Sequence, residues 1–284
     1  MSPVLCGVDR SPEGQKVASI GAALASRGDR RLRLVHVVQP PDVATRPFAT
    51  RVERQREAEE LERAGHMGVT LEEIDVPEGV AVERVVEFGD SAQTLSALAA
   101  ELPADMIVVG AGATGIERIV VGSTAAALAK DAPCPLVIVS SGAVQCSGQV
   151  LLCGVDASKF AAGVARTAAH LARCLMLELV LVHVSDGADA DGGDSRLSAA
   201  DAAAQGAPLE VVPARGSIAQ TLRDLAQDRG AAMVLVGARG RGVLKAAVLG
   251  SVSSELTDGA DRPVAVVPPA VSLGEAPSVR TSSG

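Results

Sequence analysis

The sequence predicts an α/β protein built from two tandem domains, each with a parallel sheet. Short runs rich in Val, Ile and Leu alternate with longer segments of helical periodicity, which is typical of βαβ units. Residues Leu5–Asp9 recur unchanged as Leu152–Asp156, and Val35–Val37 recur as Val182–Val184 at the same spacing of 147 residues. Each copy is roughly 140 residues long, a usual size for one compact domain. The chain is therefore expected to be a duplicated domain and not an array of short repeats.

The spacing between the two copies changes twice along the chain. Gly89 corresponds to Gly216, 127 residues later, so the second copy lacks twenty residues between its second and third strands. At Gly122 and Gly250 the spacing becomes 128, so the loop before this glycine is one residue longer in the second copy. Ser140–Gly148 is the expected linker. The domains are expected at residues 1–141 and 149–269, followed by a flexible tail at residues 270–284.

The first copy is expected to contain a full set of alternating strands and helices. Its strands are expected near Val4–Asp9, Arg31–Val38, Val69–Val76, Met106–Gly110 and Leu136–Val139. Its helices are expected near Glu13–Ser26, Arg51–Arg63, Ala92–Leu102 and Thr124–Lys130. Ser11 and Asp90 indicate two helix starts, because their side-chain oxygens can accept hydrogen bonds from free N–H groups of a first turn.

The second copy repeats this order with one difference. Its strands are expected near Gln149–Asp156, Leu177–Val184, Leu209–Pro213, Met233–Gly237 and Val264–Val267. In place of the second helix it has Ser185–Asp194, which contains four aspartates and three glycines. This segment lacks the Asp-x-Asp-x-Asp-Gly spacing and the distal Glu of a calcium loop, so it is interpreted as a solvated, flexible connection.

Composition and charge argue against several classes of protein. The chain is 48% hydrophobic and 21% charged, has a net charge of −8, and contains no Trp, no Tyr and only three Phe. It offers neither a basic face for a phosphate backbone nor a stacking platform for bases, so no nucleic-acid partner is expected. No apolar run approaches the roughly 18 residues of a membrane helix and no secretory signal is visible, so no membrane partner and a cytoplasmic location are expected.

The Cys and His residues form no recognisable catalytic or metal pattern. The five cysteines include no C-x-x-C pair, so neither disulfides nor a metal site are predicted. His36 and His183 occupy equivalent inner-strand positions and are interpreted as packed residues and not as bases. His66 and His170 have neither a repeated counterpart nor an acid in a local motif. No catalytic residue is therefore assigned.

A glycine-rich loop follows the fourth strand of each copy. Gly110–Gly115 fits the dinucleotide fingerprint G-x-G-x-x-G, but that fingerprint belongs to the first strand–helix turn of a domain, so no nicotinamide or flavin site is predicted. Both copies share glycines at the strand end, nine further residues and a Gly-Ser pair that begins at Gly122 or Gly250. Such a loop lets backbone N–H groups approach a phosphate and adds a hydroxyl and the positive end of a helix. The two loops therefore predict anion-binding cradles.

Taken together, these motifs resemble a tandem universal stress protein, from about residue 3 to about residue 268. The motifs are Gly-Val-Asp after the first strand, Val-His-Val ending the second, Gly-x2-Gly-x9-Gly-Ser after the fourth, and a Pro-flanked fifth strand at Pro133–Val139 and Arg262–Val267. The resemblance implies two tandem doubly wound parallel five-stranded sheets of order 3-2-1-4-5, similar to the adenine-nucleotide alpha-hydrolase fold. It also implies a nucleotide at the crevice between strands one and four, where the winding reverses.

The same resemblance implies which residues bind the nucleotide. Asp156 is expected to border the adenosine, and Val184 to offer backbone atoms to the adenine. The residues expected around the phosphates are Gly237, Gly240, Gly250, Ser251 and Val252. The equivalent positions in the first half are Asp9, Val37, Gly110, Gly112, Gly122, Ser123 and Thr124. For Asp9 and Asp156 an alternative stays open, which is to cap the helix that follows.

The second half is expected to hold the better nucleotide site. Its loop has two residues between the first two glycines, whereas the first-half loop has one. The second-half loop also carries Arg239, Arg241 and Lys245, while the first half offers only Arg118 beside Glu117. Because a triphosphate carries several negative charges, the larger set of cations favours the second site.

The resemblance implies an ATP-binding regulator of the stress response, with ATP bound alone or with Mg²⁺ and with a regulatory protein partner of unknown identity. Two alternatives stay open: a nucleotide-free interaction module of the same fold, and a slow ATPase, for which no residue is evidently placed to activate water. The resemblance also implies an internal pseudo-dimer through the fifth strands, alone or within a further homodimer, because an exposed strand edge favours pairing.

Overall fold

The structure is a computed structural model that describes residues 2–9, 11–38, 71–72, 74–112, 121–143, 146–185, 193–204, 206–240 and 249–273. The first half contains β1 (Val4–Gly7), α1 (Pro12–Arg27), β2 (Leu32–Val38), β3 (Val82–Phe88), α4 (Ser91–Glu101), β4 (Met106–Gly110), α5 (Ser123–Asp131) and β5 (Leu136–Val139). The second half contains β6 (Val150–Gly154), α6 (Ala161–Cys174), β7 (Glu178–Ser185), α7 (Gly193–Ala203), β8 (Leu209–Pro213), α8 (Ile218–Asp228), β9 (Ala231–Gly237), α9 (Ser251–Thr257), β10 (Val264–Val267) and α10 (Pro269–Leu273).

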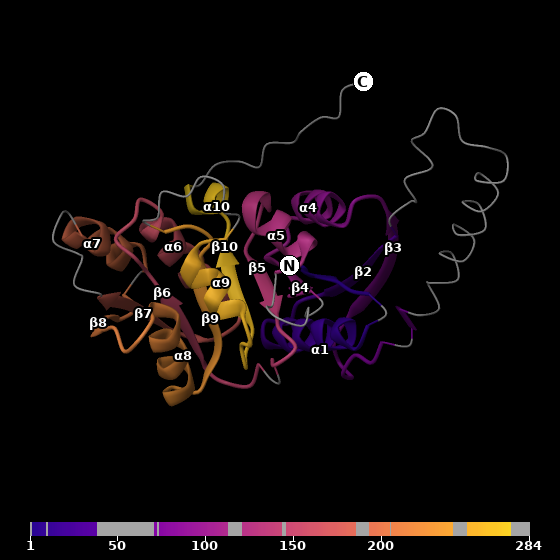
Figure 1. Cartoon of the computed structure of the whole chain (residues 1–284). Coiled ribbons are helices and arrows are strands. Elements are labelled where there is room, and N and C mark those ends of the chain that lie inside the picture. Colours follow the sequence, from indigo (N-terminus) through magenta and orange to yellow (C-terminus); the bar gives the residue numbers. More distant parts are fainter. Residues whose placement is uncertain are drawn as a thin grey trace, which may run out of the picture.

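All of these strands belong to one sheet, in the order β3-β2-β1-β4-β5-β10-β9-β6-β7-β8. Within each half the neighbouring strands are parallel and follow the order 3-2-1-4-5 that the resemblance implied. Figure 1 shows the two halves side by side, with β5 and β10 adjacent at the centre. The chain is therefore a duplicated doubly wound α/β fold whose two sheets join edge to edge.

The two halves meet through an antiparallel pairing of β5 with β10. Val137 pairs with Ala265, while Leu136 pairs with Val266 and Ile138 with Val264. Equivalent positions lie 128 residues apart in this region, so Val137 pairs with its own counterpart, Ala265. Replacing each residue of the pair Leu136–Val266 by its counterpart gives the pair Ile138–Val264. A local two-fold axis therefore passes between β5 and β10, and the expected pairing of the two fifth strands is present.

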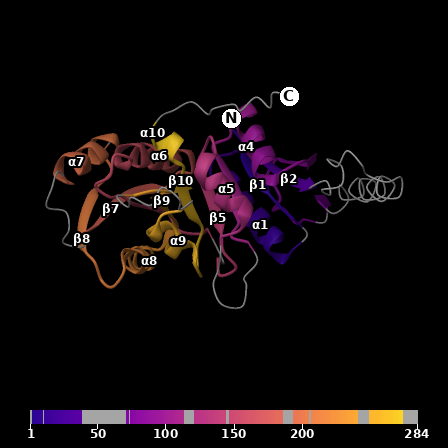
Figure 2. The same ribbon diagram turned by 45° about the horizontal axis from the view of Figure 1, so that its top comes forward.

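Helices cover both faces of the sheet (Figure 2). Because successive side chains of a strand point to opposite faces, the buried strand residues divide into two apolar clusters. One cluster packs against α1, α6 and α7, and the other packs against α4, α5, α8 and α9. The helices that follow the first and fourth strands of each half thus lie on opposite faces. This reversal of winding opens a crevice at the carboxyl ends of those two strands.

The third strand of the first half lies later in the chain than expected. The expected strand at Val69–Val76 is wrong, because Leu71 and Glu72 are helical and β3 is formed by Val82–Phe88. Leu71 and Ile74 are buried in the cluster beside α1, so their apolar character reflects the packing of a connecting segment. The repeat spacing predicts the correct position of this strand, since subtracting 127 from Leu209–Pro213 gives residues 82–86, which lie within β3.

Two further expectations need correction at their ends. The flexible connection expected at Ser185–Asp194 is wrong at both ends, because Ser185 ends β7 and α7 begins at Gly193; residues 186–192 lie outside the described part. The tail expected at residues 270–284 is wrong for its first residues, because α10 extends to Leu273; residues 274–284 lie outside the described part. The expected helix at Arg51–Arg63 also falls outside the described residues.

Both helix starts expected from capping residues are confirmed. Ser11 Oγ accepts a hydrogen bond from Gly14 N at 3.2 Å, and Pro12 occupies the first turn of α1. An Asp90 carboxylate oxygen accepts a hydrogen bond from Gln93 N at 2.9 Å at the start of α4. Each side chain satisfies one of the N–H groups that lack a partner within the helix.

The short helix α10 docks on α6 through a contact that only glycine permits. A Cβ added to Gly163 would lie 1.6 Å from the backbone oxygen of Ser272. Ser272 is buried, and its Oγ donates a hydrogen bond to Pro268 O at 3.1 Å. The backbones of α6 and α10 therefore touch directly at this point.

We expect Gly163→Ala to lower the free energy of unfolding by about 1–3 kcal/mol, because the new methyl group must push α10 off α6. Urea denaturation followed by circular dichroism measures this change. The control is the same substitution in a chain that ends at Pro268 and so lacks α10. In that shortened chain Gly163→Ala should be neutral or should stabilise the fold by up to about 1 kcal/mol, because Ala has a higher helix propensity than Gly. Equal destabilisation in both chains would contradict the docking argument.

Candidate functional site

A cavity of about 560 Å³ lies in the second half, at the carboxyl ends of β6 and β9. Its apolar walls come from the strand ends and from α6 and α8, and include Val164, Val182, Ile218, Leu222 and Val236. Its polar side is formed by the segment after β6, the loop after β9 and the start of α9. The size falls in the range of roughly 300–1,000 Å³ that is usual for small-molecule sites.

The structure brings together the seven second-half residues that the resemblance assigned to the nucleotide site. The cavity is lined by Asp156, Val184, Gly237, Gly240, Gly250, Ser251 and Val252. Four different strand or helix ends supply them, because Asp156 follows β6, Val184 lies in β7, Gly237 ends β9 and Ser251 begins α9. The residues that the resemblance implied therefore line one cavity, and the role of each residue within it stays a prediction.

Asp156 and Gly240 form one corner of the cavity. The Asp156 Oδ1 atom accepts a hydrogen bond from Ser158 N at 3.2 Å, which fixes the carboxylate beside its own turn. A Cβ added to Gly240 would lie 2.5 Å from Asp156 Oδ2. The loop after β9 therefore passes directly over the carboxylate, and it can do so because residue 240 has no side chain.

Gly250 closes the other side of the polar wall. Its N–H donates a hydrogen bond to Ala238 O at 2.8 Å, which ties the start of α9 to the end of β9. Its own carbonyl accepts from Ser254 N at 2.9 Å and from Ser253 Oγ at 3.0 Å. The loop between these ends, residues 241–248, lies outside the described part of the chain.

His183 and Arg239 contribute polar atoms to the cavity lining. His183 is buried, and its Nδ1 lies 2.9 Å from Val155 O; His36 makes the same contact with Val8 O at 2.9 Å in the first half. These rings tie the end of the second strand to the end of the first, as expected for packed residues. The Nε atom of Arg239 is buried without a hydrogen-bond partner among the described residues. Arg241 and Lys245 fall outside that part.

The first half repeats part of this arrangement. Gly122 N donates to Ala111 O at 2.6 Å, which matches the Gly250 bond, and a Cβ on Gly122 would lie 3.1 Å from Gly112 Cα. Gly112 has a φ of 96°, in the region that favours glycine. Gly110, Ser123 and Thr124 flank this contact at the end of β4 and the start of α5, and Val37 lies in β2. Residues 113–120, with Arg118, lie outside the described part.

The capping alternative for the two aspartates is partly present. In the first half Asp9 Oδ1 accepts hydrogen bonds from Ser11 N at 3.0 Å and from Ser11 Oγ at 2.5 Å. Ser11 is the residue that caps α1, so Asp9 supports the cap without being the cap. In the second half Asp156 makes the corresponding bond to Ser158 N, and Ser158 Oγ accepts from Phe160 N at 3.2 Å. This structural role leaves Asp156 at the cavity wall.

Sequence reasoning missed the apolar wall of the cavity. Ala161 and Val164 lie three residues apart on α6, and Ile218 and Leu222 lie four apart on α8. This spacing places each pair on one helix face. The same spacing is also that of ordinary core residues, so the pattern alone could not separate a binding wall from packing.

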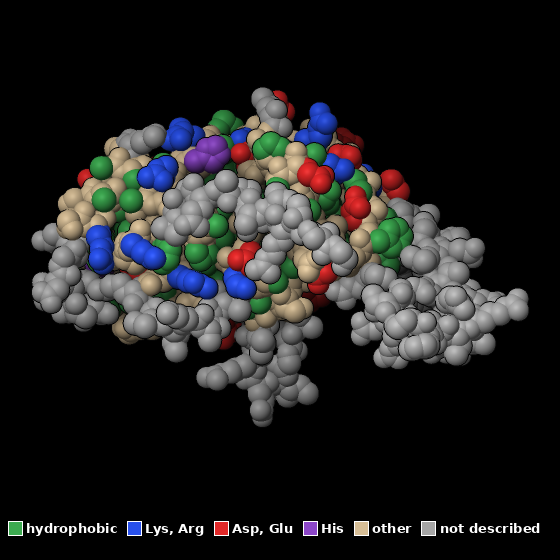
Figure 3. Space-filling view, turned by 90° about the horizontal axis from the view of Figure 1, so that it is seen from above, with side chains coloured by type: hydrophobic (Ala, Val, Ile, Leu, Met, Phe, Trp, Pro, Cys, Tyr) green, Lys and Arg blue, Asp and Glu red, His purple; other side chains and the backbone are tan. Residues whose placement is uncertain are grey.

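Charge is unevenly distributed over the surface. On the face seen in Figure 3, Lys and Arg side chains gather mainly over the second half, and most Asp and Glu side chains lie over the first half. An anion approaching this face would therefore meet a more favourable field at the second half. No helix in the described part of the chain is both long and apolar enough to cross a membrane.

Comparison with known proteins matches the fold and the repeat. A universal stress protein from Archaeoglobus fulgidus DSM 4304 superposes with a TM-score of 0.65 and 20% identity, covering 94% of this chain and 96% of that one. A putative universal stress protein from Pseudomonas aeruginosa UCBPP-PA14 gives a TM-score of 0.60 and 18% identity, covering 96% and 95%. At these identities the likeness establishes the fold alone. No curated protein matches the chain.

The family comparison is more specific than the structural one. The model of the universal stress protein family matches twice, over residues 1–140 and 149–268. These two segments are the two halves that pair through β5 and β10. The chain belongs to the universal stress protein family and carries two of its domains in tandem.

Proposed function

We propose that this protein binds ATP in the second-half cavity and acts as a nucleotide-dependent regulator in a stress response. The observation that carries the proposal is the cavity itself, which is lined by all seven of the second-half residues that the family resemblance implied. Such a match between a repeated glycine motif and a concave site is what a nucleotide site requires.

The chemistry of the lining fits an adenine nucleotide. Val164, Val182 and Leu222 offer an apolar slot for the base, and Asp156 lies where a carboxylate could accept hydrogen bonds from ribose hydroxyls. The loop after β9 and the start of α9 supply backbone N–H groups and the Ser251 hydroxyl for phosphate oxygens. The cavity is therefore apolar at one end and rich in hydrogen-bond donors at the other.

Two features of the structure itself support an anionic group at the polar end. The Arg239 Nε atom is buried without a hydrogen-bond partner in the described part of the chain, and a phosphate oxygen would satisfy it. A Cβ on Gly250 would meet nothing closer than 3.4 Å, so this glycine is not required by a close backbone contact, and its place in the cavity wall leaves its backbone accessible to a phosphate. If Mg²⁺ accompanies ATP, phosphate oxygens and water are the ligands that it would find.

We propose binding and not rapid turnover as the role of the site. The His183 imidazole is buried, and its Nδ1 lies against a backbone carbonyl. The Asp156 carboxylate already accepts a backbone hydrogen bond and lies under the loop after β9. Neither group is thus arranged as a base that activates water. Nucleotide occupancy could instead alter the loop after β9, and with it the surface offered to a protein partner.

The proposal predicts that the purified full chain binds ATP with one dominant site. Isothermal titration calorimetry measures the affinity and stoichiometry. Because the chain contains no Trp and no Tyr, protein absorbance in the near ultraviolet is very weak, and co-purified adenine would dominate the spectrum. Absence of heat on addition of ATP or ADP, together with a spectrum free of adenine, would instead support the nucleotide-free interaction module.

A further inference from the structure

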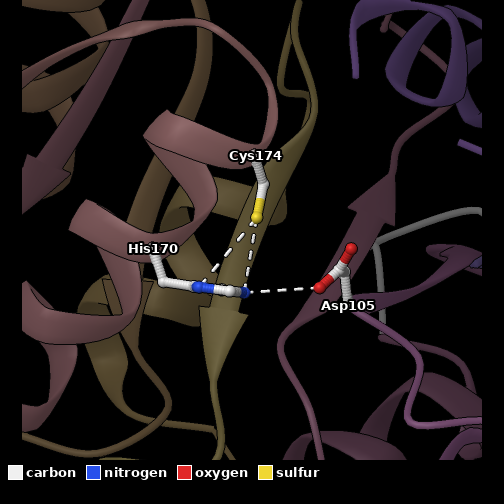
Figure 4. Close-up of side chains that lie close together, drawn as sticks. All are labelled: Asp105, His170 and Cys174. Atoms are coloured by element: carbon white, nitrogen blue, oxygen red, sulfur yellow. Dashed lines mark hydrogen bonds and ion pairs between the residues drawn. The ribbon is translucent and has the colours of Figure 1, made fainter. Parts of the chain in front are cut away.

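A second cluster of chemically active side chains lies at the junction of the two halves. Asp105 immediately precedes β4 in the first half, whereas His170 and Cys174 lie one turn apart near the end of α6 in the second half. Figure 4 shows His170 between Cys174 and Asp105, with the three side chains converging across the junction. One ligand atom from each residue lies within 4.8 Å of the others.

The two distances from His170 to the other members of this cluster match the spacing of ligands around zinc. The His170 Nε2 atom lies 3.3 Å from Asp105 Oδ1 and 3.4 Å from Cys174 Sγ. Bond lengths of about 2.0–2.3 Å in a tetrahedral Zn²⁺ site place neighbouring ligand atoms roughly 3.3–3.8 Å apart. The thiol also lies 3.9 Å from His170 Nδ1, so it sits over the ring, and metal binding requires rotation of one of these side chains. The His170 side chain is 53% exposed, which permits that rotation.

The surroundings hold the carboxylate in place and give access to the cluster. Arg30 Nε pairs with Asp105 Oδ2 at 2.5 Å, and Arg30 Nη1 donates to Cys174 O at 2.9 Å. Arg30 thus holds the Asp105 carboxylate from behind, as a hydrogen-bonding partner of a metal ligand would, and Asp105 Oδ1 faces His170. His170 and Cys174 also border a surface hollow of about 540 Å³, through which an ion can arrive.

A nucleophilic Cys–His–Asp relay is the competing interpretation of these residues, and the geometry disfavours it. In a relay the acid binds one ring nitrogen and the thiol binds the other. Here Asp105 Oδ1 and Cys174 Sγ both lie nearest to the same atom, Nε2.

We propose that Asp105, His170 and Cys174 form a Zn²⁺ site that joins the two halves of the chain. One thiolate, one imidazole and one carboxylate suit Zn²⁺ better than Mg²⁺ or Ca²⁺, which prefer oxygen ligands. Three protein ligands leave a fourth position for water or a partner side chain. The site lies at the amino end of β4, whereas the nucleotide cavity lies at the carboxyl ends of β6 and β9. The proposal is therefore independent of ATP binding.

The test uses the reduced, chelator-treated full chain titrated with Zn²⁺ against a chromophoric chelator, and separately with Co²⁺. The Co²⁺ complex should show a thiolate-to-metal absorption band in the near ultraviolet, where a chain without Trp or Tyr is nearly transparent. We expect one ion per chain. Cys174→Ser and His170→Gln should each weaken Zn²⁺ binding about tenfold or more, since even the loss of a residue that only hydrogen-bonds to a metal ligand costs roughly 10–100-fold in affinity. Because both side chains are at least partly exposed, both variants should keep the wild-type circular dichroism spectrum.

The matched control is Cys146→Ser, which removes a different free thiol that lies outside the cluster. It should leave Zn²⁺ affinity within about twofold of the wild type, a small change on the scale expected for a ligand. Added Zn²⁺ should also raise the melting temperature of the wild type but not of Cys174→Ser, because a ligand that binds only the folded state stabilises it. Failure of the wild type to bind Zn²⁺, or equal affinity in Cys174→Ser, would overturn the proposal.

Discussion

Replacing Gly250 by Val is expected to lower the affinity for ATP at least tenfold, which corresponds to about 1.4 kcal/mol of binding free energy. Gly250 lies in the cavity wall beside Ser251, where the phosphates are proposed to bind. A Cβ at this position would lie 3.4 Å from Ala238 O and 3.6 Å from Ser253 Oγ, which are ordinary contacts. The fold can therefore accept the side chain, while a phosphate can no longer reach the backbone.

Calorimetric titration with ATP measures this loss, and urea denaturation measures the accompanying change in stability. The stability cost should be no more than about 1 kcal/mol, because Val is a poorer N-cap residue than Gly. The matched control is Gly122→Val at the equivalent position of the first half. It meets Gly112 Cα at 3.1 Å and so costs more stability, but it should leave the dominant ATP affinity unchanged. If Gly122→Val weakened ATP binding and Gly250→Val did not, the first half would be the principal site.

The residues that line the candidate cavity could be placed together from the sequence because they lie at the ends of strands or at the start of the helix after the fourth strand. Asp156 follows a strand and Gly237 ends one, while Gly250 caps the helix after the fourth strand, and carboxyl ends of parallel strands meet at one edge of a sheet. Duplication strengthened this inference, since each motif occurs twice at a consistent spacing. The placement of the polar wall thus needed no knowledge of long-range packing.

The features that escaped prediction depend on contacts between distant segments. Asp105 and His170 are 65 residues apart and belong to different halves, so no local motif or repeat connects them. The docking of α10 on α6 depends on a glycine, Gly163, whose role is visible only when Ser272 is placed against it. The misplaced third strand has a different cause, because buried connecting residues such as Leu71 are as apolar as a strand. A short run of apolar residues indicates burial, but it does not by itself distinguish a strand from a buried connecting segment.

The junction between β5 and β10 allows a second large effect to be predicted, from Val137→Asp. Val137 and its partner Ala265 are both fully buried at the local two-fold axis. A carboxylate placed there loses its hydration in the middle of an apolar cluster. We expect the free energy of unfolding at neutral pH to fall by about 4 kcal/mol or more, measured by urea denaturation. The matched control is Val211→Asp in the outermost strand β8, where Val211 is 63% exposed, and its cost should be about 1 kcal/mol or less.

The pH dependence of this variant distinguishes charge burial from a simple change of shape. Burial raises the pKa of a carboxyl group in the folded state above its unfolded value of about 3.9. A group with a raised folded-state pKa holds more protons in the folded chain, so the variant loses stability relative to the wild type as the pH rises above about 4, by at most about 1.4 kcal/mol per pH unit. The difference between Val137→Asp and wild type should therefore shrink toward acid pH, while the difference for Val211→Asp should stay nearly constant. A Val137→Asp deficit that is small, or that does not change with pH, would show that the two halves do not bury this position against each other.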